Sequence, residues 1–302
     1  MVPAGILEQF GLDSSGYRIG KTGSGHINFT FLAEGPSRFI LQRINTNVFR
    51  QPDIIASNLR HAASHLSIHH PGYLFLAAIP TLNGDEMARD AEGNPWRLFP
   101  YIDNTLTVDK VDSPEQAFEA AKGFAGLSRK LDNVDTRLFR PTIPGFQDLG
   151  WRWQQLEEAL AGTTTERKSQ ATEAIRDALS FQFLVDDYRR LTSGGILKER
   201  IVHNDTKINN ILFDKTSGKA VCVIDLDTLM PGYFIYDLGD MVRTFVSPVS
   251  EEEKNLDLIG FRKPVYNALI EGYLSEMKDC LSPGEFDAVP FAGMMMTYIM
   301  AI

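Results

Sequence analysis

Apolar and polar positions alternate in the first hundred residues as in β-strands. Residues 27–32 follow the two-residue period of a strand, and residues 38–44 repeat it after a Gly-Pro-Ser turn. A helix is predicted to begin at Pro52 and to run through Leu66, because apolar side chains there recur at helical spacing. Further strands are predicted at residues 17–19, 74–79 and 96–99, with a hairpin around Asn83 and Gly84. The pattern predicts a β-rich lobe over residues 1–102.

Beyond this lobe the helical period dominates. Ser113, Pro114 and Gln116 have the form of a capping box, and an apolar stripe follows them. Further helices are predicted at about 147–161, 166–191, 252–279 and 285–302. One β-hairpin interrupts them, with strands at residues 210–213 and 220–225. Residues 103–302 are therefore expected to form a larger, mostly helical lobe, in an α+β fold.

The amino-acid composition indicates an ordinary globular protein. The chain has 302 residues, 43% of them hydrophobic and 23% charged, with a formal net charge of −9. This is ordinary globular composition, and the acidic balance argues against a nucleic-acid partner. The sequence contains no apolar stretch of about 18 residues and no signal-peptide pattern. With only two cysteines, we expect a reduced cytoplasmic protein without a membrane span or a disulfide framework.

The strongest chemical signal is the segment His203-Asn204-Asp205-Thr206-Lys207-Ile208-Asn209-Asn210. It has the H-x-D-x-K-x-x-N spacing of a kinase catalytic loop. In that chemistry Asp205 accepts the proton of the attacking hydroxyl, and Lys207 offsets charge on the transferred phosphoryl group. Asn210 reaches a metal ion that bridges the phosphates. The alternative is a polar loop before a strand.

A second signal supports the first. The apolar strand at residues 220–225 ends in Asp225 and Asp227. A kinase needs a carboxylate for Mg²⁺ near the catalytic loop. Because a hairpin brings Asp225 beside Asn210, we predict that these two residues hold Mg²⁺ and that the fold is the two-lobe fold of protein kinases.

Two further segments suit a nucleotide. Gly23, Ser24, Gly25 and His26 lie between two predicted strands, which is the position of a glycine-rich flap over nucleotide phosphates. Pro100, Tyr101 and Ile102 lie where the two lobes meet, so we predict a hinge whose backbone pairs with the adenine of ATP.

Together these residues resemble the aminoglycoside-phosphotransferase and choline-kinase superfamily, and within it the N-acetylhexosamine 1-kinases. The resemblance runs from about residue 16 to the end of the chain. It rests on residues 23–28, Ile40-Leu41-Gln42, Asn45-Thr46, Phe49, 203–212, 224–228, Met230-Pro231-Gly232, Asp237, Gly239-Asp240 and Arg243. It implies phosphoryl transfer from ATP to the anomeric hydroxyl of N-acetylglucosamine or N-acetylgalactosamine. Asp205, Asp227 and Arg243 are the sugar contacts that we assign on this basis, and Asp237 is expected to fix the loop after the metal site.

Two features depart from related patterns. A protein kinase has a lysine on its third strand that pairs with a helix glutamate. Here Gln42 stands in that place, as it does in the sugar-kinase subfamily, and the first helix has no acidic residue from Ile54 to His70. We assign Gln42 to the nucleotide site and expect Arg43, Lys21 or Lys207 to supply positive charge.

The second departure is the end of the chain. Residues 291–302 predict an apolar helix without a cap. In the resembled family an arginine and then a tyrosine follow here and contact the sugar. We therefore expect a truncated C-terminal lobe. Two alternatives stay open: another aminoglycoside, choline or homoserine kinase of the superfamily, and an inactive truncated chain that only binds nucleotide.

Overall fold

The computed structural model describes residues 2–23, 27–251 and 253–302. Its N-terminal half is built on an antiparallel sheet with the strand order β1-β2-β3-β5-β4. The strands are β1 (Arg18–Lys21), β2 (Phe29–Glu34), β3 (Arg38–Arg43), β4 (Ala88–Arg89) and β5 (Pro95–Pro100). The predicted strands at 38–44 and 96–99 are confirmed, and the strand predicted at 27–32 is present two residues later in the chain, as β2. In this sheet β3 lies between β2 and β5, which places Gln42 opposite Thr30 on one side and Arg97 on the other.

The predicted strand at residues 74–79 is wrong. Within it only Ile79 pairs, through an isolated bridge to Leu98. The hairpin that precedes β5 turns at residues 90–94 and not at Asn83-Gly84, because the Asp90 carboxylate accepts hydrogen bonds from the backbone N–H groups of Glu92 and Asn94. Such an Asx-type turn closes the chain without the Asn-Gly pair that the sequence also offers.

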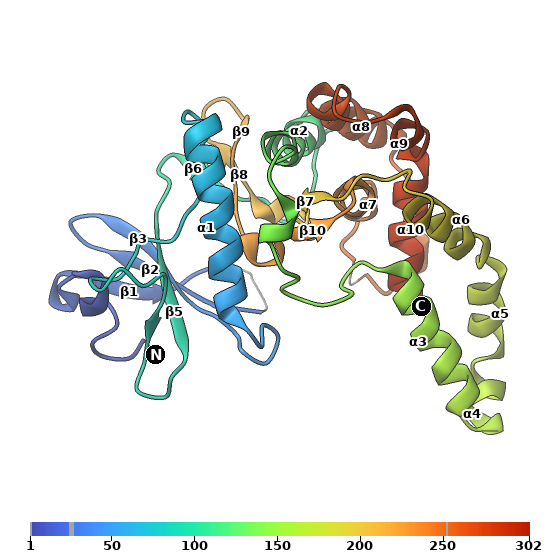
Figure 1. The fold of residues 1–302 in the computed structure, drawn as a ribbon, viewed down its shortest axis with the longest axis horizontal. Coiled ribbons are helices and arrows are strands. Elements are labelled where there is room, and N and C mark those ends of the chain that lie inside the picture. Colours follow the sequence, from blue (N-terminus) through green and yellow to red (C-terminus); the bar gives the residue numbers. More distant parts are fainter. Residues whose placement is uncertain (1, 24–26, 252) are drawn as a thin grey trace.

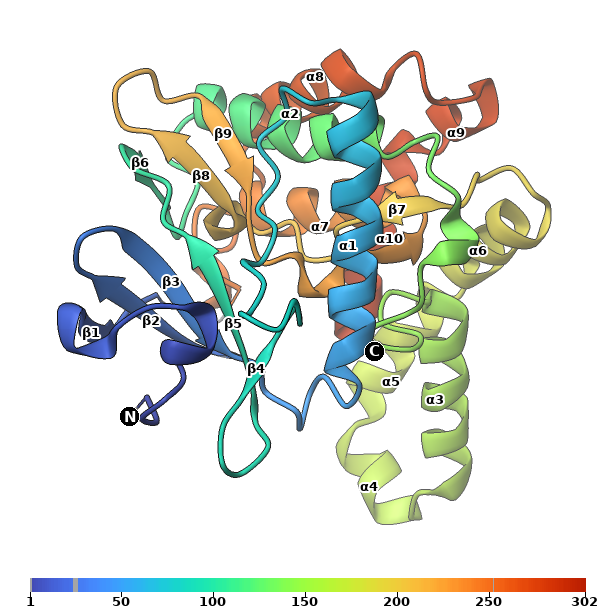
Figure 2. The ribbon, with the colours of Figure 1, turned by 60° about the vertical axis from the view of Figure 1, so that its left-hand side comes forward.

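The N-terminal segment and helix α1 both lie against the N-terminal sheet. Ile6, Leu7 and Phe10 in the N-terminal segment pack on one face, against Leu41 and Trp96. Helix α1 (Pro52–His69) stands beside the sheet and faces the helical half of the molecule (Figure 2). Its buried side chains, Ile55, Leu59, Ala62 and Leu66, belong to the hydrophobic core of that half. Because α1 packs on both halves, it fixes their relative position.

The C-terminal half is mostly helical (Figure 1). Its helices are α2 (Pro114–Lys130), α3 (Leu149–Gly162), α4 (Thr165–Gln170), α5 (Thr172–Ser180), α6 (Phe183–Ser193), α7 (Phe234–Phe245), α8 (Lys263–Met277), α9 (Pro283–Asp287) and α10 (Val289–Ala301). Helix α2 packs along α8, and α7 along α10. Two small sheets complete it, one of β7 (Arg200–Val202) with β10 (Met230–Gly232) and one of β6 (Thr105–Leu106), β8 (Ile211–Asp214) and β9 (Ala220–Val223). The α+β two-lobe fold is thus the predicted one.

Several predicted helix boundaries are wrong. The single helix expected at 166–191 is divided into α4, α5 and α6, which with α3 form an arm that extends from the core (Figure 1). The helix expected at 252–279 begins only at Lys263, where Pro264 occupies the first turn. The helix expected at 285–302 is divided at Ala288, because Pro290 occupies the first turn of α10 and cannot continue the preceding helix. The helix predicted at 147–161 and the hairpin of β8 and β9 are confirmed.

Candidate active site

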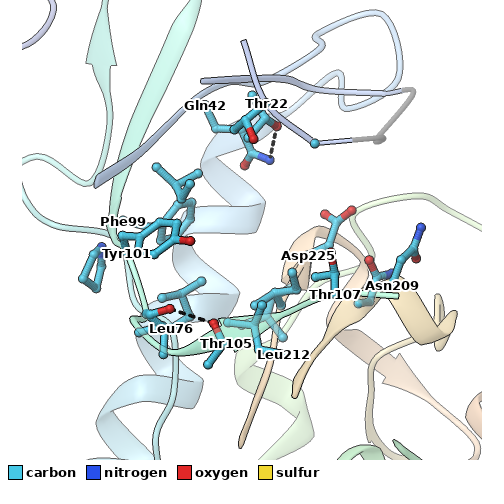
Figure 3. A pocket seen from close by; sticks show the side chains of 18 of the residues that line it. Thr22, Gln42, Leu76, Phe99, Tyr101, Thr105, Thr107, Asn209, Leu212 and Asp225 are labelled. Atoms are coloured by element: carbon cyan, nitrogen blue, oxygen red, sulfur yellow. Dashed lines mark hydrogen bonds between the residues drawn. The ribbon is translucent and has the colours of Figure 1, made fainter. Parts of the chain in front are cut away.

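A cavity of about 520 Å³ lies between the two halves. Gln42 and Thr22 line its wall on the sheet side, and Asp225 and Asn209 face them from the other side (Figure 3). Apolar side chains line the part near residue 101: Ile40, Leu76, Phe99, Tyr101, Ile102 and Leu212. The cavity therefore has an apolar end and a polar, acidic end, which suits a ligand with a flat base and a charged tail.

The segment predicted as a hinge lines the apolar end. Pro100 is the last residue of β5 and has no N–H group. The backbone N–H of Tyr101 donates to Arg38 O at 3.1 Å, and Ile102 O accepts a hydrogen bond from the Thr105 hydroxyl at 2.7 Å. Within the part of the chain that the structure describes, the Ile102 N–H makes no backbone hydrogen bond, so it is the backbone donor at this point that is available to a ligand.

The predicted catalytic loop follows β7 and has a constrained backbone. The N–H of Asp205 donates to His203 Nδ1 at 3.2 Å, and His203 Nε2 lies 2.9 Å from Ile224 O. The first bond makes Nδ1 an acceptor, so the ring carries its proton on Nε2 and donates it to Ile224 O. Asn204 has a positive φ of 68°. His203 thus connects this loop to Ile224, which lies between the end of β9 and Asp225.

Two carboxylates of helix α7 accept hydrogen bonds from the backbone of the same loop. Asp237 accepts hydrogen bonds from the backbone N–H groups of His203 at 3.0 Å and Asn204 at 2.7 Å. Asp240 accepts one from the N–H of Thr206 at 2.8 Å. Both carboxylates are buried, and burial raises the pKa of Asp240 to about 6, even though Arg243 beside it opposes the rise. Asp237 therefore holds the loop of residues 203–210 itself, whereas the sequence predicts a role for Asp237 in the loop after the proposed metal site.

The β8–β9 hairpin brings the two predicted metal ligands together. The N–H of Ile224 donates to Asn210 O at 2.9 Å, and Asp225 follows directly. Asn210 donates through Nδ2 to Asp205 O at 2.8 Å and to Asp205 Oδ2 at 3.2 Å. One amide thus links the predicted base to the predicted metal site.

Asp225 itself has an unusual environment. Its backbone is left-handed, with φ 54° and ψ 58°, a conformation that costs energy for a residue other than glycine and is common at functional sites. The protein packed around its carboxylate, and the charges of Asp227 and Asp205, raise the pKa of Asp225 to about 7. The residue itself is exposed to the cleft, where the like charges of Asp227 and Asp205 act on it.

The donor set fits a magnesium ion. Mg²⁺ prefers oxygen ligands, and one or two carboxylates together with substrate phosphates are its usual partners. Asp225 offers a carboxylate at the cavity wall. Asn210 uses its amide nitrogen on Asp205, which leaves its amide oxygen for a cation. The residues present therefore fit Mg²⁺ bound jointly with a phosphate.

Two predicted basic residues meet at one carboxylate. Lys207 Nζ lies 2.7 Å from Glu251 Oε1, and Arg243 pairs with Glu251 and, at 2.8 Å, with Asp240 Oδ1. Burial by itself would lower the pKa of Lys207, but the nearby carboxylates of Glu251 and Asp205 raise it by more, so the pKa lies above its usual value. Lys207, Arg243 and Glu251 therefore form one polar cluster beside the catalytic loop.

The other predicted nucleotide residues are placed differently. Gly23 lines the cavity, whereas Ser24, Gly25 and His26 lie outside the described residues. Gln42 lines the cavity as well. Arg43, a candidate for positive charge, stacks its guanidinium over the Phe29 ring at 4.2 Å, and Lys21 is exposed on β1.

The sequence reasoning missed one residue of the site, Arg97. It lies on β5 opposite Gln42, is 3% exposed and lines the cavity. Its Nη1 is 2.5 Å from Asp227 Oδ1, and the second oxygen of Asp227 accepts a hydrogen bond from Asn28 Nδ2 at 2.7 Å. The available signal was a lone arginine inside an apolar strand, Trp96-Arg97-Leu98-Phe99, where burial demands a charged partner.

Comparison with known proteins shows the family of the chain and the proteins that share its fold. The profile of the phosphotransferase enzyme family (APH) matches residues 19–270. A microcompartment-associated aminopropanol kinase superposes with a TM-score of 0.67 at 18% identity, over 98% of this chain and 86% of that one. An amicoumacin kinase in complex with AMP-PNP and Ca²⁺ superposes with a TM-score of 0.62 at 14% identity, over 93% of this chain and 79% of that one. An ethanolamine kinase from Plasmodium vivax superposes with a TM-score of 0.55 at 12% identity, over 94% of this chain and 75% of that one. At these identities the structures show a shared fold.

Proposed function

Since this chain belongs to the phosphotransferase enzyme family, we propose that it uses ATP and Mg²⁺ to phosphorylate the anomeric hydroxyl of an N-acetylhexosamine. Family membership carries the coarser part, which is a phosphotransferase with an alcohol group as acceptor. The sugar, the metal and the residue roles are the proposed part. A cytoplasmic location and the division into lobes at residue 102 belong to the same proposal.

One observation carries the proposal: Asp205, Asn210 and Asp225 are joined into a single unit at the acidic end of the cavity. Asn210 donates to Asp205 Oδ2 at 3.2 Å and accepts from the N–H of Ile224, the neighbour of Asp225. A base and a metal ligand in fixed relation are what phosphoryl transfer requires, because its catalysis is mainly positioning and charge stabilisation. A solvated loop would not need this bonding.

The chain's own residues have the following roles. Asp205 accepts the proton of the anomeric hydroxyl as the sugar oxygen forms its bond to the γ-phosphorus of ATP. The bond from that phosphorus to the bridging oxygen breaks, and ADP carries away the electron pair. Lys207 lies beside Asp205 and offsets the charge of the transferred group. Asp225 and Asn210 would hold Mg²⁺, and the bound ion would supply positive charge to the phosphates.

The cavity supports the orientation of ATP. The adenine occupies the apolar end, where Phe99 and Leu212 lie on opposite sides, with the Ile102 N–H as hydrogen-bond donor. The phosphates then extend toward Asp225. The Gly23 segment, which lines the cavity next to Thr22, lies along this path.

The acceptor assignment comes from sequence. The segments H-N-D-T-K-x-N-N-I-L and I-D-L-D-T-x-M-P-G resemble those of N-acetylhexosamine 1-kinases. The cluster of Lys207, Arg243 and Glu251 supports it, because charged donors and acceptors beside the base can bind hydroxyl and acetamido groups. Of the predicted sugar contacts Arg243 fits best, since Asp227 is 2% exposed and both its oxygens have partners.

The test is an ATP-consumption assay with a panel of acceptors. N-acetylglucosamine and N-acetylgalactosamine should each be compared with choline, homoserine and an aminoglycoside. We expect turnover only with the N-acetylhexosamines, and a sugar 1-phosphate as the product. Turnover with choline, homoserine or the aminoglycoside alone would replace the proposed acceptor by another of the superfamily. Absence of turnover with every acceptor, together with measurable ATP binding, would support a chain that only binds nucleotide.

A further inference from the structure

The cavity has an unexpected buried cation on its sheet side. Among the described residues that line the cavity, Arg97 and Lys215 carry basic side chains, and only Arg97 is buried. Because Arg97 and Gln42 are directly opposed on antiparallel strands, their side chains emerge on the same face of the sheet. That face is the cavity wall, since both residues line it.

The contacts of Arg97 leave part of its guanidinium available. Nε and Nη2 donate to Gln42 Oε1 at 3.0 and 2.6 Å, and Nη1 pairs with Asp227 Oδ1. A guanidinium has five N–H groups. Among the described residues, two of them donate to Gln42 and Nη1 is engaged by the ion pair, so at least one N–H on each terminal nitrogen remains for a ligand in the cavity.

The acidic partner of Arg97 comes from the other half of the molecule. Asp227 lies in the 3₁₀ turn Leu226–Thr228, two positions after Asp225. Asn28 on the sheet side also binds Asp227, and the N–H of Asn45 donates to Asn28 Oδ1 at 3.0 Å. The pair therefore joins the sheet to the turn that carries the proposed metal ligand.

Protein kinases place a strand lysine at this wall, where it contacts the nucleotide phosphates and pairs with a glutamate. Here the lysine position is Gln42. We propose that Arg97 replaces that lysine as the residue of the sheet that binds the nucleotide phosphates, with Asp227 as its acidic partner. The inference rests on the proposed use of ATP, and does not depend on the identity of the acceptor.

A stabilising role alone explains the arrangement less well. A buried ion pair gains little over well-packed apolar side chains, whereas a single member left unpaired is costly. An apolar pair at these positions would hold the halves together equally well. A cation that keeps two donors toward an acidic cavity instead suits a polyanionic ligand.

The experiment compares a charged ligand with an uncharged one. Binding of Mg²⁺–AMP-PNP and of adenosine is measured by calorimetry on the wild type and on Arg97→Gln, Arg97→Lys and the exchange variant Gln42→Lys/Arg97→Gln. Arg18→Gln is the matched control, because Arg18 forms an exposed ion pair with Glu34 in the same sheet. Thermal melting of each variant reports folding.

We expect Arg97→Gln to weaken Mg²⁺–AMP-PNP binding by on the order of 30-fold, while adenosine binding stays near the wild-type value. The exchange variant should recover most of the loss, because it returns a cation to the same face, and Arg97→Lys should bind more tightly than Arg97→Gln. Equal weakening of both ligands, or wild-type affinity in Arg97→Gln, overturns the proposal.

A double variant separates binding from folding. Arg97→Gln/Asp227→Asn removes both charges and leaves no unpaired buried ion. We expect it to melt at a higher temperature than Arg97→Gln and still to bind Mg²⁺–AMP-PNP weakly. Restored affinity in the double variant would show that Arg97 only neutralises Asp227, and would overturn the inference. Wild-type protein that binds AMP-PNP but phosphorylates no sugar refutes the proposed acceptor alone, whereas wild-type protein that binds no AMP-PNP refutes both proposals.

Discussion

The carboxylate of Asp237 accepts the backbone N–H of Asn204 at 2.7 Å, and this bond connects helix α7 to the residue before the proposed base. The same carboxylate accepts the N–H of His203 at 3.0 Å. Asn204 has φ 68°, so its backbone is held in a conformation that an unsupported loop would leave. The position of Asp205 therefore depends on a buried residue of α7 that does not line the cavity.

We expect Asp237→Ala to destabilise the protein by about 2–4 kcal/mol, because two buried N–H groups lose their acceptor. Activity should fall more steeply than stability, since Asp205 is no longer positioned. Urea denaturation and turnover below the unfolding transition would measure the two effects. Asp187→Asn, which removes an exposed pairing with Arg190 on α6, should change stability by less than about 0.5 kcal/mol. Wild-type turnover in Asp237→Ala would contradict this role.

Replacement of the proposed base should affect chemistry and not folding. Asp205→Asn keeps the size of the side chain and an oxygen that can accept from Asn210 Nδ2. We expect turnover to fall about 10²–10⁴-fold, with an unchanged melting temperature and nearly unchanged AMP-PNP affinity. A variant that retains wild-type turnover would exclude Asp205 as the base.

A buried ion pair far from the cavity should make stability depend on pH. Arg200 and Glu285 are each 1% exposed, and Arg200 Nη2 donates to Glu285 Oε2 at 3.1 Å. Burial alone would raise the pKa of Glu285, but hydrogen bonds from Arg200 and from the N–H groups of Ser282 and Lys198 outweigh burial and lower it. A carboxylate whose pKa is lower in the folded state stabilises the fold above its unfolded pKa, about 4.3. That contribution is lost as the pH falls through the folded value.

Glu285→Gln should therefore lose about 1–3 kcal/mol of stability at pH 7, because Arg200 loses one of its two carboxylate partners and keeps Asp132, which lies 2.7 Å from Arg200 Nε. Below about pH 4 the difference from the wild type should narrow, since the wild-type carboxylate becomes protonated there. Denaturation curves at pH 3 to 8 would test this, with the exposed Glu173→Gln on α5 as the control. A difference from the wild type that stays constant across this range would show that Glu285 acts through packing alone.

The contact between α2 and α8 depends on a glycine. A Cβ added at Gly272 would lie 2.3 Å from Phe118 O, so the two helices cannot keep their separation with any larger residue. We expect Gly272→Ala to destabilise the protein by about 1–3 kcal/mol. Gly162→Ala at the end of α3, where a Cβ meets nothing within 4 Å, should instead be neutral or stabilise by about 0.5–1 kcal/mol. Equal effects at the two glycines would contradict the close packing.

The sequence determined the local parts of the site. Asn210 and Asp225 are joined by one hairpin, and register within a hairpin follows from strand alternation and a short turn, so their proximity could be predicted. The residues from His203 to Asn210 lie in one stretch of chain, and their spacing alone is enough to propose the chemistry of the loop. Apolar residues recur with a period of about two in the first lobe and of about 3.6 in the second, which predicts strands in the first and helices in the second. These features needed no knowledge of distant contacts.

Only the tertiary structure decided the contacts between segments that are far apart in the chain. Arg97 meets Gln42 across a strand pair and Asp227 from the other half of the molecule. The local pattern contains neither contact, and it points to Arg43, Lys21 and Lys207 for the positive charge instead. Residues 74–79 have the composition of a strand, but a strand also needs a partner edge, and here only Ile79 pairs. The local sequence pattern indicates which secondary structure a residue prefers. The contacts of that residue depend on the packing of the whole chain. A buried charge such as that of Arg97 needs an opposite charge, and that charge can come from a distant segment.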